Sequence, residues 1–103
     1  MKYLLYLALA GCTSAASTGI ATVSCPTDST LTYTNFGEAF VSDNCLSCHA
    51  SRENPRLGTQ AEIQSNSSRI LEAAVYTDAM PQNTSMDVSE RELLGEWLAC
   101  GAP

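Results

Sequence analysis

Two cysteines and a histidine near the middle of the chain are spaced for covalent haem chemistry. Residues 45–49 read CLSCH, the C-x-x-C-H pattern of a c-type haem attachment sequence. On one incipient helical turn, the thiols of Cys45 and Cys48 can each form a thioether with a haem vinyl group. His49 then places its Nε2 atom under the iron, while its Nδ1–H is left to donate to a carbonyl. The pattern predicts one covalent haem c bound by Cys45, Cys48 and His49.

The carbonyl that orients His49 is expected in the loop that follows the motif. Pro55 lies in this loop, and its carbonyl is our candidate acceptor. The alternative is that Pro55 is a plain loop proline before Arg56 and Leu57.

The second axial ligand of the iron can be narrowed by counting side chains. The chain has one histidine and three methionines, so a second histidine ligand from the chain is excluded, and Met1 belongs to a segment expected to be removed. Pro81 holds Met80 in an extended conformation, which suits a loop that presents a side chain to the iron. Met86 could equally fill a gap in the core. We predict Met80 as the ligand; Met86, or neither methionine, remains an alternative.

Other uses of a C-x-x-C pair account for the sequence less well. A thioredoxin-like redox pair needs a βαβ context, and no convincing strands can be placed. A zinc site or an iron–sulfur cluster would recruit Cys25 and Cys100 as further ligands beside the motif cysteines. Either site is possible on the number of cysteines alone, but it would leave His49 without a role.

The N-terminus has the features of an export signal. Residues 1–11 read MKYLLYLALAG: one positive charge, an apolar run and then small residues. The run is much shorter than the ~20 residues that span a bilayer. The sequence LAGC over residues 9–12 resembles the lipobox of bacterial lipoproteins. We therefore expect an exported protein on the periplasmic side of the envelope with a lipid anchor at Cys12; an ordinary signal cleaved after Ala10 is the alternative.

Composition predicts a single small domain. The chain has 103 residues, of which 45% are hydrophobic and 16% charged, and its net charge is −6. Residues 13–24 are small and polar, so we expect a flexible tether over residues 12–24 and a domain over residues 25–103. The scattered arginines exclude a nucleic-acid binding patch. The acidic surface would suit a partner with a basic face, or else it has no partner preference.

Capping-box patterns predict three helix starts in an all-α domain. The pairs are Asn35 with Glu38, Thr59 with Glu62, and Ser89 with Glu92. The first helix should run toward Cys45, and the second should cover 61–64. An apolar stripe predicts another helix over residues 70–75, ending before Pro81, and the last helix should stop at Gly101. Three to four short helices and no strand pair are therefore expected.

The chain resembles class I c-type cytochromes, specifically the small bacterial monohaem modules. The resemblance covers most of residues 36–101. It rests on Gly37 in the helix before the attachment motif, on the motif itself, on Met80 followed by Pro81, and on Trp97 in the final helix. It implies a cytochrome c-like fold wrapped around one covalent haem. In that family the first and last helices cross where a glycine meets an aromatic residue, here Gly37 and Trp97.

The chain also departs from the family pattern. Val41 occupies a position, four residues before Cys45, that is often aromatic. Only 30 residues, 50–79, separate His49 from Met80, which implies short loops and an exposed haem edge. The crossing of the terminal helices implies that Cys25 lies near Cys100, so that the two form a disulfide in an exported protein; two buried free thiols are the alternative.

The expected function is electron transfer. With His49 and Met80 both on the iron, no position is open for a substrate, and no catalytic nucleophile or phosphate-binding loop is visible. The chain is therefore expected to be a carrier for redox partner proteins, as a monomer or as a subunit of a redox complex, and not an enzyme. The alternatives are a haem-based sensor with an open or labile sixth position and a structural zinc protein with four cysteine ligands.

Overall fold

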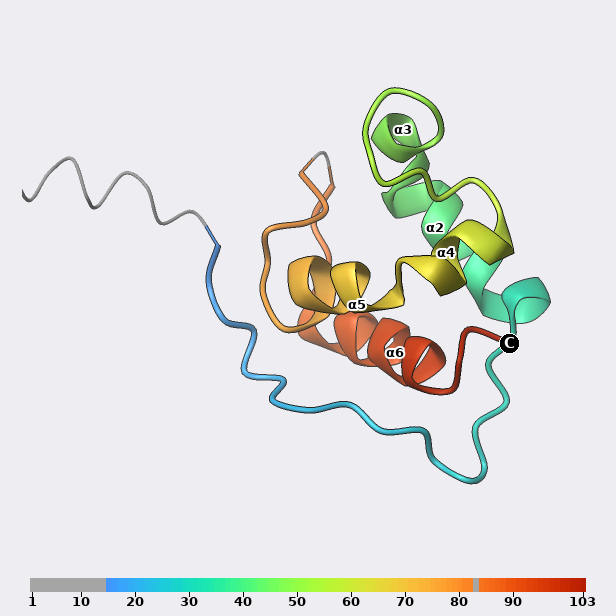
Figure 1. The fold of residues 1–103 in the computed structure, drawn as a ribbon. Coiled ribbons are helices and arrows are strands. Elements are labelled where there is room, and N and C mark those ends of the chain that lie inside the picture. Colours follow the sequence, from blue (N-terminus) through green and yellow to red (C-terminus); the bar gives the residue numbers. More distant parts are fainter. Residues whose placement is uncertain (1–14, 83) are drawn as a thin grey trace, which may run out of the picture.

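The computed structural model describes residues 15–82 and 84–103, and this part of the chain is helical (Figure 1). In chain order its elements are the π-helix η2 (Tyr33–Gly37), α2 (Glu38–Asn44), α3 (Leu46–His49), α4 (Gln60–Ser65), α5 (Ser67–Ile70), the π-helix η3 (Leu71–Val75) and α6 (Val88–Ala99). The described residues form no strand, only an isolated bridge between Ser17 and Thr77. The all-α prediction is confirmed. The predicted signal segment and Cys12 lie outside the described residues.

None of the helices in the described ranges has the length and apolar character needed to cross a membrane.

One of the three predicted capping boxes is confirmed. The hydroxyl of Thr59 accepts the N–H of Glu62 at 3.2 Å, and the Glu62 carboxylate accepts the N–H of Thr59 at 3.0 Å. Helix α4 starts directly after this pair. The helix predicted over residues 70–75 is also present, as the continuous helical run of α5 and η3.

The other two predicted helix starts are wrong. The first helical run is capped by Thr32, whose hydroxyl accepts the N–H of Asn35, while Asn35 accepts the N–H of Thr32 at 2.7 Å. The last helix is capped in the same way by Asp87 and Glu90. In both places an acceptor side chain two or three residues earlier reaches the free N–H groups first. Hydrogen bonds from the Glu90 N–H and from the Ser89 hydroxyl lower the pKa of Asp87.

The first and last helical runs meet at Gly37 and Trp97, as the family resemblance implied. Trp97 is fully buried, and a Cβ atom at Gly37 would overlap its ring. Two further aromatic rings surround the indole, since Tyr33 stacks on it at 6.5 Å between centroids and Phe36 meets it edge-on at 5.9 Å. Only glycine permits this approach, and it brings η2 and α2 against α6.

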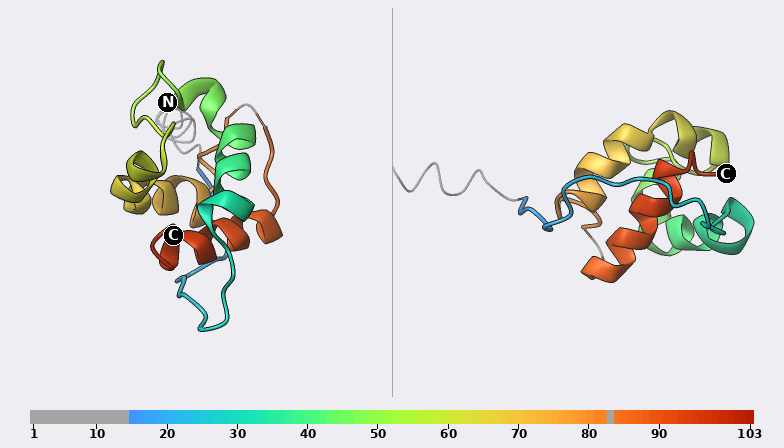
Figure 2. Two further views of the ribbon diagram at one scale, coloured as in Figure 1. Left: turned by 90° about the vertical axis from the view of Figure 1, so that its right-hand side faces the viewer. Right: turned by 90° about the horizontal axis from the view of Figure 1, so that it is seen from below.

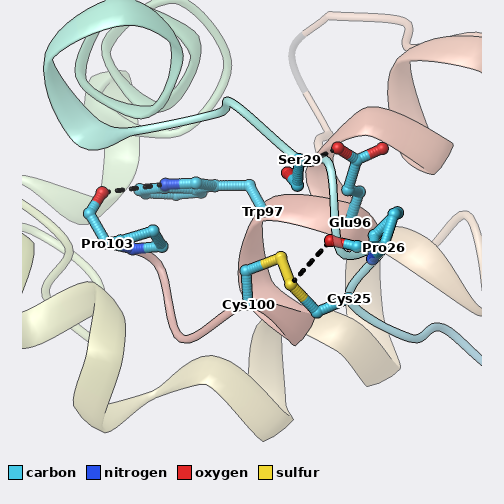
Figure 3. The surroundings of a disulfide bond; sticks show 7 residues. All are labelled: Cys25, Pro26, Ser29, Glu96, Trp97, Cys100 and Pro103. Atoms are coloured by element: carbon cyan, nitrogen blue, oxygen red, sulfur yellow. Dashed lines mark hydrogen bonds between the residues drawn. A yellow bond between two sulfur atoms is a disulfide. The ribbon is translucent and has the colours of Figure 1, made fainter.

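A disulfide joins Cys25 to Cys100, as the resemblance implied (Figure 3). It links the segment that precedes η2 to the end of α6, with a Cα–Cα distance of 4.7 Å. Nearby, the hydroxyl of Ser29 donates to the carboxylate of Glu96 at 2.6 Å. The bond uses the two thiols that a four-cysteine zinc site or iron–sulfur cluster would need, so neither alternative can be built from this arrangement.

The described segment before Cys25 packs against the helices, which differs from the tether predicted over residues 12–24. Ala16 and Thr18 exchange hydrogen bonds with residues 75–78, among them the N–H of Thr18 to the carbonyl of Tyr76 at 3.0 Å. Val23 lies over Gly95, where a Cβ atom would come within 2.6 Å of the Val23 methyl group. Figures 1 and 2 show this segment running beside α6. Residues 16–23 therefore belong to the packed domain.

Substitution of Gly37 by alanine tests the helix crossing. Alanine favours a helix over glycine, but its methyl group would have to displace the Trp97 ring, so Gly37→Ala should lower the free energy of unfolding by about 1–3 kcal/mol. Gly58→Ala is the control, because the nearest atom to its Cβ would lie 3.7 Å away, and it should change the free energy by less than about 0.5 kcal/mol. Urea denaturation measures both, and equal stabilities for the two variants would contradict the crossing.

Removal of the disulfide should destabilise the protein without changing its fold. The bond closes a loop with a sequence separation of 75, so the Cys25→Ser, Cys100→Ser double variant should lose roughly 4 kcal/mol, because its unfolded chain gains entropy. Urea denaturation of the two proteins gives the difference, and far-ultraviolet circular dichroism checks that the helices remain. An unchanged stability, or equal stabilities of the wild type with and without reductant, would show that the bond is not formed in solution.

Candidate functional site

A cavity of about 430 Å³ collects the predicted site residues. Cys45, Cys48, His49 and Met80 all line it. Its volume is within the usual range for small-molecule and cofactor sites. Figure 1 shows α3 and the loop after residue 75 reaching the same end of the molecule from different sides. Residues that are far apart in the sequence are thus brought to one site.

The two motif thiols are positioned by the short helix α3. The Cys45 N–H donates to the carbonyl of Val41 at the end of α2, and the Cys45 carbonyl accepts the N–H groups of Cys48 at 3.3 Å and of His49 at 2.9 Å. This tight turn presents both thiols and the imidazole to the cavity. Burial raises the pKa of the Cys45 thiol to about 11, so this thiol is protonated at neutral pH. The Sγ atom of Cys48 lies 3.6 Å from the Arg52 guanidinium.

His49 is oriented by the loop that follows it. Its Nδ1 atom lies 2.8 Å from the carbonyl oxygen of Pro55, which confirms Pro55 as its partner. Because a carbonyl can only accept, Nδ1 carries the proton, and the lone pair is on Nε2. The Leu57 N–H donates back to the carbonyl of His49 at 2.8 Å. The loop thus fixes both the backbone and the ring of the histidine.

The two candidate methionines have different environments. Met80 is half-buried, lines the cavity, and donates its N–H to the carbonyl of Ala73 at 2.8 Å. Met86 is 6% exposed, belongs to the hydrophobic core, and is not among the residues that line this cavity. The structure therefore brings Met80, and not Met86, to the same cavity as His49.

The rest of the cavity wall combines apolar side chains with polar ones from both helices and loops. Ile70, Ala73 and Ala74 come from α5 and η3, and Leu57 comes from the loop after the motif. Sequence reasoning placed Ile70 and Ala74 in a helix stripe but missed their part in the site. The two consecutive alanines, Ala73 and Ala74, among larger side chains were the available signal, since small side chains leave room for a ligand.

Sequence reasoning also missed the buried side chain of Arg91. It is 6% exposed and donates to the carbonyl of Met80 at 2.8 Å. A single arginine among the glutamates of the last helix gave no indication of burial.

No group of three or more His, Cys, Asp or Glu side chains within residues 15–82 and 84–103 is arranged to hold a metal ion. Comparison of the chain with protein-family models, with curated proteins and with solved structures finds no match.

Proposed function

We propose that the protein is a monohaem c-type cytochrome that carries single electrons between redox partners in the cell envelope. The observation that supports this most strongly is the composition of the cavity wall. Both motif thiols, the imidazole of His49 and the thioether of Met80 line one cavity. The first three come from α3 and the residue before it, and the fourth comes from a loop that thirty residues separate from His49. This is the set of groups needed to attach a haem and to occupy both axial positions of its iron.

Each residue has a distinct role in the proposed site. Cys45 and Cys48 would hold the haem by two thioethers. His49, oriented by its hydrogen bond of 2.8 Å to the Pro55 carbonyl, offers Nε2 to the iron. Met80 offers its sulfur from the loop. The haem supplies an iron that alternates between the ferric and ferrous states, and methionine ligation raises its reduction potential relative to a second histidine.

The apolar part of the cavity wall supports a cofactor with a large apolar surface, such as haem. Leu57, Ile70 and Ala74 are buried side chains that supply apolar wall, and the apolar surroundings of a metal site limit solvent access and tune its potential. If His49 and Met80 both held the iron, no position on it would remain open for a substrate. Electron transfer, which needs little movement of the ligands, is the function that this arrangement favours.

The proposed location is the periplasmic side of the cell envelope, with a lipid anchor at Cys12. The disulfide between Cys25 and Cys100 supports an oxidising compartment, which is where c-type haems are attached. The net charge of −6 supports redox partners with a basic docking face.

Haem attachment can be tested with matched pairs of cysteine substitutions. When the protein is produced with haem-attachment machinery, the wild type should gain the mass of one haem and keep it on a denaturing gel. The Cys45→Ala, Cys48→Ala double variant should carry no covalent haem. The Cys25→Ser, Cys100→Ser double variant also lacks two cysteines and should keep the haem, because its cysteines are outside the cavity. A wild-type protein without covalent haem would contradict the proposal.

Two methionine variants should show whether Met80 or Met86 is the ligand of the iron. The ferric wild type should show the weak far-red band of methionine–histidine ligation. Met80→Ala should abolish the band and permit carbon monoxide binding in the ferrous state. Met86→Ala should keep the band but lower the free energy of unfolding by about 2–5 kcal/mol, because it leaves a cavity in the core.

The same spectra identify the alternatives. Loss of the band only in Met86→Ala would make Met86 the ligand. A high-spin wild type that binds carbon monoxide would instead favour a haem-based sensor with an open sixth position.

A further inference from the structure

The loop that carries Met80 is hydrogen-bonded to one buried, positively charged side chain of α6. Arg91 points from the first turns of α6 into the space under this loop and is 6% exposed. Its guanidinium donates to four backbone carbonyls: from Nη1 to Ala74 at 2.7 Å, to Thr77 at 3.3 Å and to Met80 at 2.8 Å, and from Nε to Met86 at 3.2 Å. These carbonyls lie at the end of η3 and along the whole loop that follows it.

This use of arginine is chemically specific. A buried positive charge is unfavourable unless hydrogen bonds replace its water, and a guanidinium has five donors in a planar fork to do so. All the hydrogen bonds that Arg91 makes with described residues end on backbone carbonyls. Arg91 therefore does not neutralise a carboxylate there, and its hydrogen bonds fix the path of the backbone. A lysine could not copy this arrangement, because its one nitrogen cannot take the places of both Nη1, which bonds three carbonyls, and Nε, which bonds the fourth.

Both backbone groups of Met80, its N–H and its carbonyl, form hydrogen bonds. Its N–H donates to the Ala73 carbonyl at 2.8 Å, and its carbonyl accepts from Arg91 at 2.8 Å. The side chain itself is only half-buried and lines the cavity. The Met80 side chain also packs against the core. Its backbone sets where that side chain begins, and Arg91 is the only side chain of α6 that bonds to that backbone among the described residues.

We propose that Arg91 is a positioning residue that keeps Met80 on the iron and so prevents external ligands from taking its place. This inference rests on the proposed function, since it assumes a haem bound by His49 with Met80 opposite. The loop exchanges between a closed state, with Met80 bound, and an open state that exposes the iron. An external ligand binds only the open state, so its apparent affinity is reduced by the small open fraction.

Imidazole binding to the ferric holoprotein measures that open fraction. Arg91→Lys keeps the positive charge but replaces the planar guanidinium by a single nitrogen. Arg91→Met removes all four hydrogen bonds of the side chain while keeping much of its length. Each should increase the apparent affinity for imidazole by roughly tenfold or more, because loss of a single charge-assisted hydrogen bond shifts an equilibrium by about that factor. The far-red band should weaken in parallel, at a temperature where circular dichroism shows both variants folded.

The Cys25→Ser, Cys100→Ser double variant is the control for a general loss of stability. It should be strongly destabilised, but it leaves every hydrogen bond of Arg91 in place. Its affinity for imidazole should equal that of the wild type. If Arg91→Met does not fold, Arg91→Lys decides the question alone.

The possible results separate this inference from the proposed function. Increased imidazole affinity in the Arg91 variants but not in the control supports the positioning role. Wild-type affinity in the Arg91 variants, or an equal increase in the control, overturns that role and leaves the cytochrome proposal intact. A wild-type holoprotein with covalent haem but no far-red band overturns the methionine ligand, and the role of Arg91 with it.

Discussion

The close contact between Gly37 and the Trp97 ring is the interaction on which the rest of this small structure depends. The indole is fully buried, and its Nε1–H donates to the carbonyl of Pro103 at 3.3 Å (Figure 3). The same carbonyl accepts the N–H of Tyr33, and the preceding carbonyl, that of Ala102, accepts from two glutamine side chains of α4. The contact, together with the carbonyls of Ala102 and Pro103 beside it, therefore joins the first helical run, the last helix and α4. Because α3 follows α2 directly, this packing also determines where the motif residues lie.

The candidate site depends on this framework because its own helices are very short. Helix α3 has four residues, and the continuous run of α5 and η3 has nine; isolated helices of these lengths are not stable in water. They are maintained by packing on their neighbours, by loop hydrogen bonds such as His49 to Pro55, and by the disulfide at the far end of α6. A covalently bound cofactor would add to this stabilisation, as small domains often require.

Local patterns predicted which residues line the cavity better than they predicted the boundaries of the helices. The motif at residues 45–49 and the Thr59–Glu62 capping box each lie within a few residues. The sequence alone was therefore sufficient to predict that the motif side chains lie together and that a helix starts after Thr59. At Asn35 and Ser89 several possible caps lie close together, and the choice depended on which acceptor reached the first free N–H groups. Other features depend on distant contacts. Val23 packs because Gly95 leaves space for it, and Arg91 is buried because four carbonyls surround it. Neither position carries a signal in its own neighbourhood.

The attachment of residues 16–18 beside the Met80 loop has a mechanical consequence. The Ala16 carbonyl accepts the N–H of Asp78, and the Ala16 N–H donates to the Asp78 side chain at 2.7 Å, two residues before Met80. A pulling force that enters the domain from its N-terminal side meets these hydrogen bonds before it reaches the disulfide at Cys25. The first part of the domain to yield under tension would therefore be the edge of the Met80 loop, while the covalent link at Cys25 passes the remaining load to α6.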